Sequence, residues 1–305
     1  MNDKTGSTEA IRFVVAGGTG SIGRAVVREL CDRGHRVSVM VRPESLQSAR
    51  TSFEDESVEV LAADFDDPPA ITAVLGGEAP VIAISCLASR SGAPVDAQRV
   101  DYAANSHFLD AVQRAGARRF VLLSAICVQR PHLAFQHAKL RFESELAAAP
   151  IDYTIIRPTA FFKSLSGQVK RVAAGKPFLL FGDGTLTRCK PISDADLARF
   201  IVERATDPDA VGKVLPIGGP GPAISLKDQG AMLFALTGQP PRYRSISPRM
   251  FDVAARVLSL GAPFSGWFAE KAEYARIAKY YATQSMLLID PDASWFSVAH
   301  CQYNR

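Results

Sequence analysis

A strand that runs directly into a glycine-rich turn constrains this chain more than any other feature. Residues 11–23 read IRFVVAGGTGSIG, and an amphipathic helix begins near Ser21. The glycines fit both G-x-x-G-x-x-G and G-x-G-x-x-G. Glycine allows a tight turn and lets the backbone approach a pyrophosphate, which then lies at the helix N-terminus. We therefore expect a dinucleotide to be held by Gly17, Gly18, Thr19, Gly20, Ser21, Ile22 and Gly23.

Strands and helices alternate along the rest of the first two thirds of the chain. The apolar patterns predict further strands at 36–41, 58–62, 80–85, 119–124, 152–157 and 212–217, with helices at about 95–115, 160–174 and 191–205. Such alternation is typical of an α/β fold with a doubly wound parallel Rossmann sheet. The sequence from Ser225 onward is helical and apolar, so we expect a smaller, mostly helical C-terminal substrate-binding part.

These patterns also suggest how the chain is divided. Residues 1–10 are polar and are expected to form a flexible tail. Residues 11–160, completed by 191–218, are expected to form the NADP-binding Rossmann domain. Residues 161–190 and 219–305 are assigned to the substrate-binding part.

The residues that follow the strands are candidates for cofactor contacts, because ligands bind at the carboxyl ends of parallel strands. Arg42 lies where an NAD site would place an acid against the ribose, and a guanidinium there suits the 2′-phosphate of NADP. The alternative is an exposed loop arginine. Asp64 is expected near the adenine, or as a helix cap, while Cys86 and Leu87 should lie along the nicotinamide half. Pro158 and Thr159, at the end of the strand at 152–157, are further candidates for cofactor contacts.

The fifth strand and the next helix carry the catalytic candidates. Ser124 ends the strand, and Phe135 and Lys139 then occupy the two positions of the Y-x-x-x-K motif of short-chain dehydrogenases. Phenylalanine cannot exchange a proton, so ordinary alcohol–ketone chemistry is unsupported. Lys139 lies one helical turn on, on the same face, and is expected to bind the nicotinamide ribose. The alternative is a solvated helix lysine.

Composition excludes several other classes of protein. The 305 residues are 47% hydrophobic and 22% charged, with a formal charge of +4 spread along the chain. This distribution argues against a nucleic-acid partner. No apolar run is long enough to span a membrane and no signal peptide is recognisable, so a cytoplasmic protein is expected. The five cysteines are scattered singly, which predicts neither a metal site nor an iron–sulfur cluster.

Several longer motifs carry a more specific resemblance. The segments SCLASRSG, RVDY, RRFVLLSAICVQRP, FQHAKLRFE, RPTAFFKSLSGQV, FGDG and CKPISDADLA resemble the divinyl chlorophyllide 8-vinyl reductases of chlorophyll and bacteriochlorophyll synthesis. VLPIGGPG and EYARIAKYYATQSMLLIDP extend the match, which covers residues 11–291. Members of this family also carry phenylalanine at the position of Phe135. After residue 291 the family usually continues with a longer tail, whereas this chain ends in ASWFSVAHCQYNR.

The resemblance implies an atypical short-chain dehydrogenase that uses NADPH without flavin or metal. It implies reduction of an 8-vinyl group to ethyl on a divinyl chlorophyllide or protochlorophyllide. Peripheral contact with a photosynthetic membrane and the oligomeric state stay open. A flat tetrapyrrole needs apolar and aromatic walls with a few polar anchors, and the candidates are Phe161, Phe162, Lys163, Tyr280 and Tyr281.

Reduction of a conjugated vinyl group by hydride requires a proton as well. Lys139, Ser124, Tyr102 or water could donate it, and the sequence gives no geometry with which to choose. Two other functions are weighed against reduction of a vinyl group. One is a non-catalytic NADP sensor, and the other is a sugar-nucleotide epimerase or carbonyl reductase, against which Phe135 argues.

Overall fold

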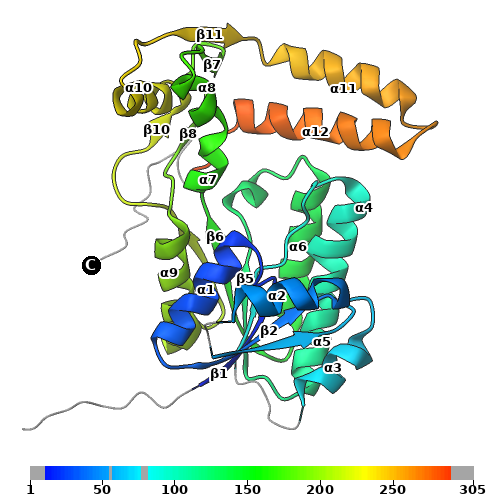
Figure 1. Cartoon of the computed structure of the whole chain (residues 1–305). Helices are drawn as coiled ribbons and strands as arrows, with labels where there is room; N and C mark the ends of the chain where they lie inside the picture. Colours follow the sequence, from blue (N-terminus) through cyan, green and yellow to red (C-terminus); the bar gives the residue numbers. More distant parts are fainter. Residues whose placement is uncertain (1–10, 55–56, 77–81, 290–305) are drawn as a thin grey trace, which may run out of the picture.

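A seven-stranded parallel sheet forms the centre of the protein (Figure 1). The computed structural model describes residues 11–54, 57–76 and 82–289. The strand order is β3-β2-β1-β4-β5-β6-β9. The strands are β1 (Arg12–Ala16), β2 (Arg36–Val41), β3 (Val58–Ala62), β4 (Ile82–Ser85), β5 (Arg119–Leu123), β6 (Asp152–Pro158) and β9 (Lys213–Ile217). The order reverses between β1 and β4, and ligands bind outside the carboxyl ends of strands at such a point.

The predicted α/β class and the doubly wound parallel sheet are confirmed. β2 and β3 have the predicted bounds, while β5 ends one residue earlier and β6 one residue later than predicted. The first two residues of the predicted strand at 80–85 lie outside the described residues, as do the predicted tail at 1–10 and residues 290–305.

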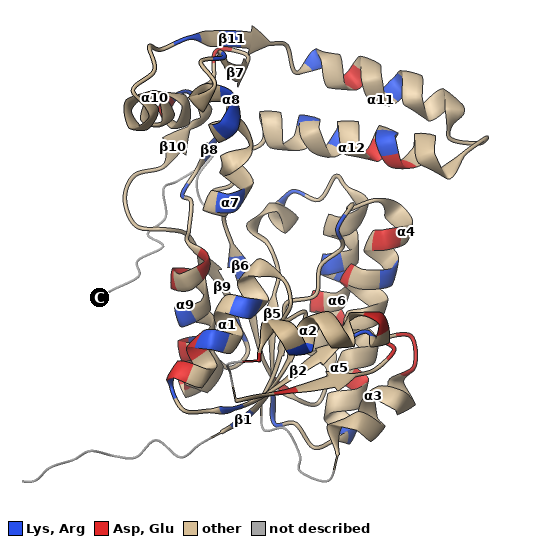
Figure 2. Ribbon diagram, viewed as in Figure 1, with Lys and Arg blue, Asp and Glu red and all other residues tan. Residues whose placement is uncertain are grey.

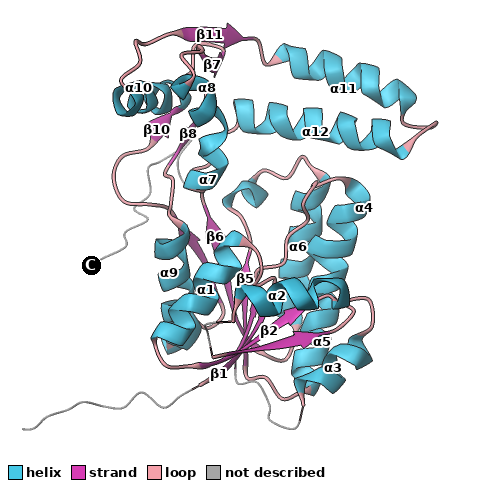
Figure 3. Ribbon diagram, in the orientation of Figure 1, coloured by secondary structure: helices cyan, strands magenta, loops and turns pink. Residues whose placement is uncertain are grey.

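Two helical layers cover the sheet (Figure 3). On one face α1 (Ser21–Asp32), α2 (Leu46–Ser52) and α9 (Asp194–Thr206) pack on the sheet through buried aliphatic side chains. The other face carries α3 (Pro68–Leu75), α5 (Asn105–Arg114) and α6 (Ala134–Ala148). Ser193 caps α9 by accepting from the Asp196 amide at 3.0 Å.

The helix predicted at about 95–115 is present but is not regular. It runs through α4 (Pro94–Asp96), η2 (Ala97–Ala104) and α5, and η2 has π-helical geometry. Such wide turns inside helices are frequent at functional sites. Short 3₁₀ turns occur at η1 (Pro43–Ser45), η3 (Ile126–Gln129) and η5 (Pro208–Ala210).

The prediction of a single helix at 160–174 is wrong. The segment forms three short pieces, α7 (Phe162–Leu165), η4 (Ser166–Gln168) and α8 (Val169–Ala173). The Gln168 side chain accepts from the Leu179 amide at 2.7 Å and donates to its carbonyl at 2.9 Å. This tertiary contact, together with the low helix propensity of Gly167, explains the interruption.

The C-terminal part is mostly helical, as predicted, but also contains two small sheets. Its helices are α10 (Leu226–Thr237), α11 (Arg249–Gly261) and α12 (Gly266–Thr283). β7 (Phe178–Phe181) pairs in parallel with β11 (Tyr243–Ile246), and β8 (Arg188–Cys189) pairs antiparallel with β10 (Ile224–Ser225). The α11–α12 hairpin lies over the carboxyl end of the main sheet (Figure 1).

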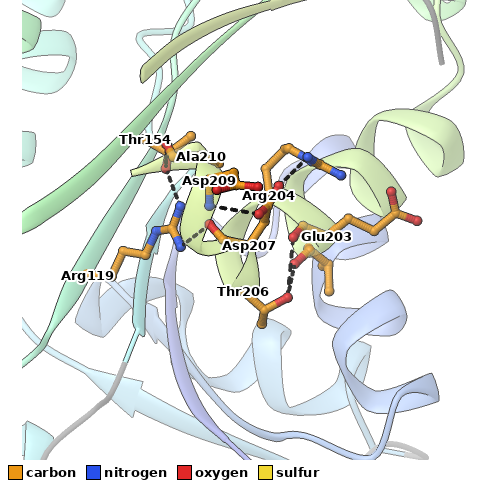
Figure 4. Close-up of polar contacts among 9 residues, drawn as sticks. Arg119, Thr154, Glu203, Arg204, Thr206, Asp207, Asp209 and Ala210 are labelled. Atoms are coloured by element: carbon orange, nitrogen blue, oxygen red, sulfur yellow. Dashed lines mark hydrogen bonds and ion pairs between the residues drawn. The ribbon is translucent and has the colours of Figure 1, made fainter. Parts of the chain in front are cut away.

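The opposite, N-terminal end of the sheet is held by a buried arginine (Figure 4). Arg119 donates to the Thr154 hydroxyl at 2.7 Å and to the Asp207 carbonyl at 2.8 Å, and Thr154 donates to the Ala210 carbonyl at 2.8 Å. These bonds fix the turn after α9 against β5 and β6. This end of the sheet therefore has a structural role.

Candidate functional site

The glycine turn between β1 and α1 has the close packing that its sequence motif predicts. Gly17 has φ +75° and its carbonyl accepts from the Gly20 amide at 3.1 Å. A Cβ at Gly23 would lie 2.2 Å from the Gly17 oxygen, and one at Gly18 would lie 2.7 Å from Val39 Cγ1. No side chain caps α1, so the amides of its first turn keep the capacity to bind an anion. This cradle fits a dinucleotide pyrophosphate.

Arg24 supports the outer side of this turn and was not identified from the sequence. Its Nε donates to the Thr19 carbonyl at 3.0 Å and its Nη2 donates to the Ser52 hydroxyl at 3.2 Å. The side chain therefore connects the turn to α2. Ser21 and Ile22 begin α1 beside it, with Ser21 exposed and Ile22 buried.

The ends of β2 and β3 place Arg42 and Asp64 at the surface. Arg42 precedes η1, is 56% exposed, and forms an ion pair with Glu44 at 3.1 Å. An exposed pair of this kind is worth little, so a phosphate could replace it. Asp64 accepts from the Asp66 amide at 2.9 Å. Asp64 does not cap the next helix, because Asp67 accepts from the Ala70 amide at its N-terminus.

The end of β4 passes directly beside the glycine turn. A Cβ at Gly17 would lie 2.7 Å from the Cys86 carbonyl carbon and 3.0 Å from the Leu87 nitrogen. The Leu87 amide donates to the Ser85 hydroxyl at 3.3 Å, which fixes the following turn. Burial raises the pKa of the Cys86 thiol to about 12, against the opposing effect of the nearby Lys139 charge. The structure thus places Cys86 beside both the glycine turn and the Lys139 charge, and Leu87 beside the glycine turn.

Lys139 is buried and paired, which contradicts its alternative interpretation as a solvated helix residue. Its Nζ lies 2.9 Å from Asp101 Oδ1, and the two side chains are 10% and 1% exposed. Asp101 Oδ1 also accepts from the Ser89 amide at 3.3 Å. Its other oxygen is buried without a hydrogen-bond partner among the described residues. Asp101 lies in the π-helical segment η2, and the motif analysis did not single it out.

Ser124 lies in a separate buried network. Its hydroxyl donates to Glu143 Oε1, and the same carboxylate binds Arg157 through both oxygens, with Arg157 Nε at 3.2 Å from Oε1. Glu143 and Arg157 were not among the sequence candidates. Because the Ser124 proton is already donated to a carboxylate, this arrangement is suited to holding β5, β6 and α6 together.

Tyr102 points to a different part of α6. The Arg141 guanidinium lies 3.7 Å from the centre of its ring. The pKa of the Tyr102 hydroxyl is raised, mainly by a hydrogen bond to Glu145 and to a smaller extent by burial. The structure therefore places Tyr102 with Arg141 and Glu145, whereas its neighbour Asp101 contacts Lys139.

Phe135 lies beneath α12. A Cβ at Gly92 would lie 3.3 Å from Phe135 Cδ1 and 3.0 Å from Ile277 Cδ1, so the three residues are adjacent. Ile277 and Phe135 belong to the same apolar cluster. An apolar contact therefore occupies the position at which the dehydrogenase motif would place an acid.

The two tyrosines near the end of α12 join this helix to the loop after β5. The Tyr280 hydroxyl donates to the Cys127 carbonyl at 2.9 Å or to the Arg130 carbonyl at 3.1 Å. Tyr281 is half exposed, but its hydroxyl lies against the Cys127 thiol, and its pKa is raised mainly by burial. The Lys139 charge also acts on Cys127. Both tyrosines thus lie next to the Lys139 region.

The end of β6 carries the remaining candidates. Pro158 is buried, and Thr159 donates its amide to the Ile217 carbonyl at 2.9 Å and its hydroxyl to the Lys190 carbonyl. Phe161 is partly buried beside Ile192. Phe162 and Lys163 are exposed on α7.

The four cysteines within the described ranges are free thiols. In that same part of the chain, no group of three His, Cys, Asp or Glu side chains could hold a metal ion. None of the helices with described positions is both long and apolar enough to cross a membrane.

Comparisons with known proteins agree with this geometry. A family of NAD(P)H-binding proteins matches residues 17–208. A chloroplastic divinyl chlorophyllide a 8-vinyl-reductase from Oryza sativa subsp. indica is 48% identical, over 93% of this chain and 73% of that protein. The protein of the same name from Arabidopsis thaliana is 41% identical, over 95% of this chain and 73% of that protein.

A solved structure supports the fold alone. The NADPH-dependent quinone oxidoreductase QOR2 from Escherichia coli, complexed with NADPH, is 21% identical with a TM-score of 0.69. The similarity covers 89% of this chain and 90% of that one.

Proposed function

This chain belongs to the divinyl chlorophyllide a 8-vinyl-reductase family, and we propose that it uses NADPH to reduce an 8-vinyl group to ethyl. The substrate is a divinyl chlorophyllide or protochlorophyllide in chlorophyll synthesis. The observation that carries this proposal is the 48% identity to a named reductase over 93% of the chain. The buried Lys139–Asp101 pair beside the glycine cradle supports it.

The cofactor site follows from the ends of the strands. The glycine turn and the first turn of α1 hold the pyrophosphate, Asp64 faces the adenine, and Arg42 pairs with the 2′-phosphate. Cys86, Leu87, Pro158 and Thr159 border the nicotinamide half. When bound, NADPH supplies a hydride to the vinyl group, which is conjugated to the tetrapyrrole ring. We assign residues 11–160 and 191–218 to this site.

Lys139 is the candidate that we favour as the proton donor. Asp101 binds and orients the Lys139 side chain inside the protein, with Lys139 Nζ 2.9 Å from Asp101 Oδ1. The alternatives are less suited, because the Ser124 hydroxyl donates to Glu143 and the pKa of Tyr102 is raised. Lys139 also contacts the nicotinamide ribose in this proposal, so it acts both in binding and in proton transfer.

In this proposal the substrate binds in the part of the chain formed by residues 161–190 and 219–305, through a small number of its side chains. Phe161, Phe162 and Lys163 come from the α7 side, and Tyr281 comes from α12. Tyr280 supports them, since its hydroxyl is bound to the Cys127 loop. The adjacent Phe135 and Ile277 exclude water from the reacting carbon atoms.

Peripheral contact with a photosynthetic membrane, from the cytoplasmic side, is a further part of the proposal. Residues 257–269, at the turn of the α11–α12 hairpin, contain no charged side chain, and Figure 2 shows this uncharged tip. Leu260, Phe264 and Trp267 there are 76%, 88% and 56% exposed. Lys271 lies 5.9 Å from the Trp267 ring centre. Exposed aromatic rings beside a lysine are typical of a membrane interface.

The experiment that tests the function is incubation with NADPH and divinyl chlorophyllide, followed by pigment chromatography. A monovinyl product supports the reductase. A non-catalytic NADP sensor would bind NADPH without oxidising it. Turnover of a simple ketone would favour a carbonyl reductase, which the apolar surroundings of Phe135 oppose.

A further inference from the structure

A groove of about 700 Å³ runs along the α11–α12 hairpin and ends against the loop before α6. Its volume is within the range of small-molecule sites. Apolar side chains, three cations and one carboxylate share its lining, which includes Leu133, Tyr280, Asp252, Arg256, Arg276 and Lys279. A mainly apolar ligand with one anionic group would match this combination.

The cations of the groove differ in their pairing. Lys279 lies 2.6 Å from Asp252, and Arg276 lies 2.8 Å from Glu273. Arg256 is exposed and makes no ion pair or hydrogen bond with any residue in the described ranges. The guanidinium of Arg256 is therefore the group in this lining that has its full capacity for an added anion.

The groove is next to the region of Lys139. Tyr280 forms part of the lining, and its hydroxyl binds the Cys127 carbonyl at 2.9 Å. The charge of Lys139 in turn acts on the Cys127 thiol. Tyr280 and the short η3 loop therefore connect the lining of the groove to the region of the buried lysine.

We propose that this groove binds the carboxylate-bearing edge of the tetrapyrrole and that Arg256 pairs with the propionate carboxylate. This inference rests on the proposed function. A guanidinium can bind a carboxylate through two parallel hydrogen bonds, which fixes orientation as well as affinity. The propionate and the 8-vinyl group are on opposite rings of the macrocycle. Anchoring the propionate in the groove thus leaves the vinyl edge free to extend toward Lys139.

The test compares the free-acid substrate with its propionate methyl ester, which has no negative charge. Arg256→Gln should raise the KM for the free acid about tenfold or more, which is the effect of losing one charge-assisted hydrogen bond. The kcat and the Kd for NADPH should change little. The wild-type protein should show the same loss for the methyl ester, and Arg256→Gln should not distinguish the two substrates.

Two variants serve as controls. Arg249→Gln removes an exposed arginine from the same helix but outside the groove, and it should leave all constants unchanged. Arg256→Lys keeps a positive charge and should restore part of the preference for the free acid. Fluorescence titration of each pigment, without NADPH, measures binding independently of turnover.

The two proposals fail in different ways. If Arg256→Gln retains the full preference for the free acid in both KM and binding, the groove assignment is overturned while the reductase activity stands. If the wild-type protein binds the free acid through Arg256 but never reduces it, the groove assignment stands and the proposed function is overturned.

Discussion

The buried Lys139–Asp101 pair allows a quantitative prediction about stability. Asp101→Asn keeps the shape of the side chain but leaves the Lys139 ammonium without its counter-charge at a 10% exposed position. Removing one partner of a buried ion pair typically costs about 3–5 kcal/mol, because an uncompensated charge remains inside the protein. Lys139→Met should cost a similar amount, since it strands the Asp101 carboxylate.

The double variant separates a true pair from two unrelated buried groups. With both charges removed, the loss in the free energy of unfolding should be at least about 2 kcal/mol smaller than the sum of the two single losses. Urea unfolding followed by circular dichroism provides the measurement. If the loss in the free energy of unfolding of the double variant equals the sum of the two single losses, the Lys139–Asp101 pairing is refuted.

A surface pair provides the matched control. Asp110 and Arg114 on α5 lie 3.0 Å apart, but their side chains are 43% and 60% exposed. Asp110→Asn should cost no more than about 0.5 kcal/mol. The same preparations also test function. Lys139→Met should weaken NADPH binding and, if Lys139 donates the proton, lower turnover at saturating cofactor roughly 100-fold or more.

Three further predictions concern the cofactor, the thiols and the hairpin tip. Arg42→Ala should weaken NADPH by roughly 1.5–3 kcal/mol and NADH much less, as isothermal titration would measure, and equal losses would remove the NADP assignment. The pKa of Cys86 is raised to about 12 and that of Cys189 to about 11. The stabilisation that these thiols contribute is therefore fully present below their unfolded-state pKa near 9, and it is lost as the pH rises toward their folded-state pKa values. The free energy of unfolding should fall by at most about 1.4 kcal/mol per pH unit for each thiol. In urea unfolding experiments between pH 9 and 11, the Cys86→Ala variant should show a smaller fall in the free energy of unfolding than the wild-type protein. Phe264→Asp should reduce co-sedimentation with anionic phospholipid vesicles about tenfold. Met232→Asp, at a 51% exposed position on α10, should leave co-sedimentation unchanged, and equal effects of both would contradict a specific tip contact.

The features that sequence reasoning located well are those that depend on local pattern. β2 and β3 have the predicted bounds because their mainly apolar runs, RVSVMV and VEVLA, end at clear breaks. The glycine turn was predictable for a similar reason, because the close approach of Gly23 to Gly17 occurs within seven consecutive residues. Lys139 was found through its motif position.

The features that it missed depend on contacts between distant segments. Asp101 reaches Lys139 only because η2 packs on α6, and nothing in the local sequence indicates that pairing. The predicted helix at 160–174 is broken because Gln168 binds the backbone of β7. The apolar pattern after Ser225 does not show which aromatic residues are buried, and Phe264 is 88% exposed on the hairpin tip. Local periodicity cannot tell which face of a helix finds a partner.

The most direct test of the account is conversion of the pigment itself. The protein is incubated with NADPH and divinyl chlorophyllide, and the pigments are separated by chromatography while NADPH absorbance is followed. We predict one monovinyl product formed per NADPH oxidised, with Lys139→Met strongly impaired at saturating NADPH. If the wild-type protein binds NADPH but leaves the divinyl pigment unchanged, the proposed reductase function is contradicted.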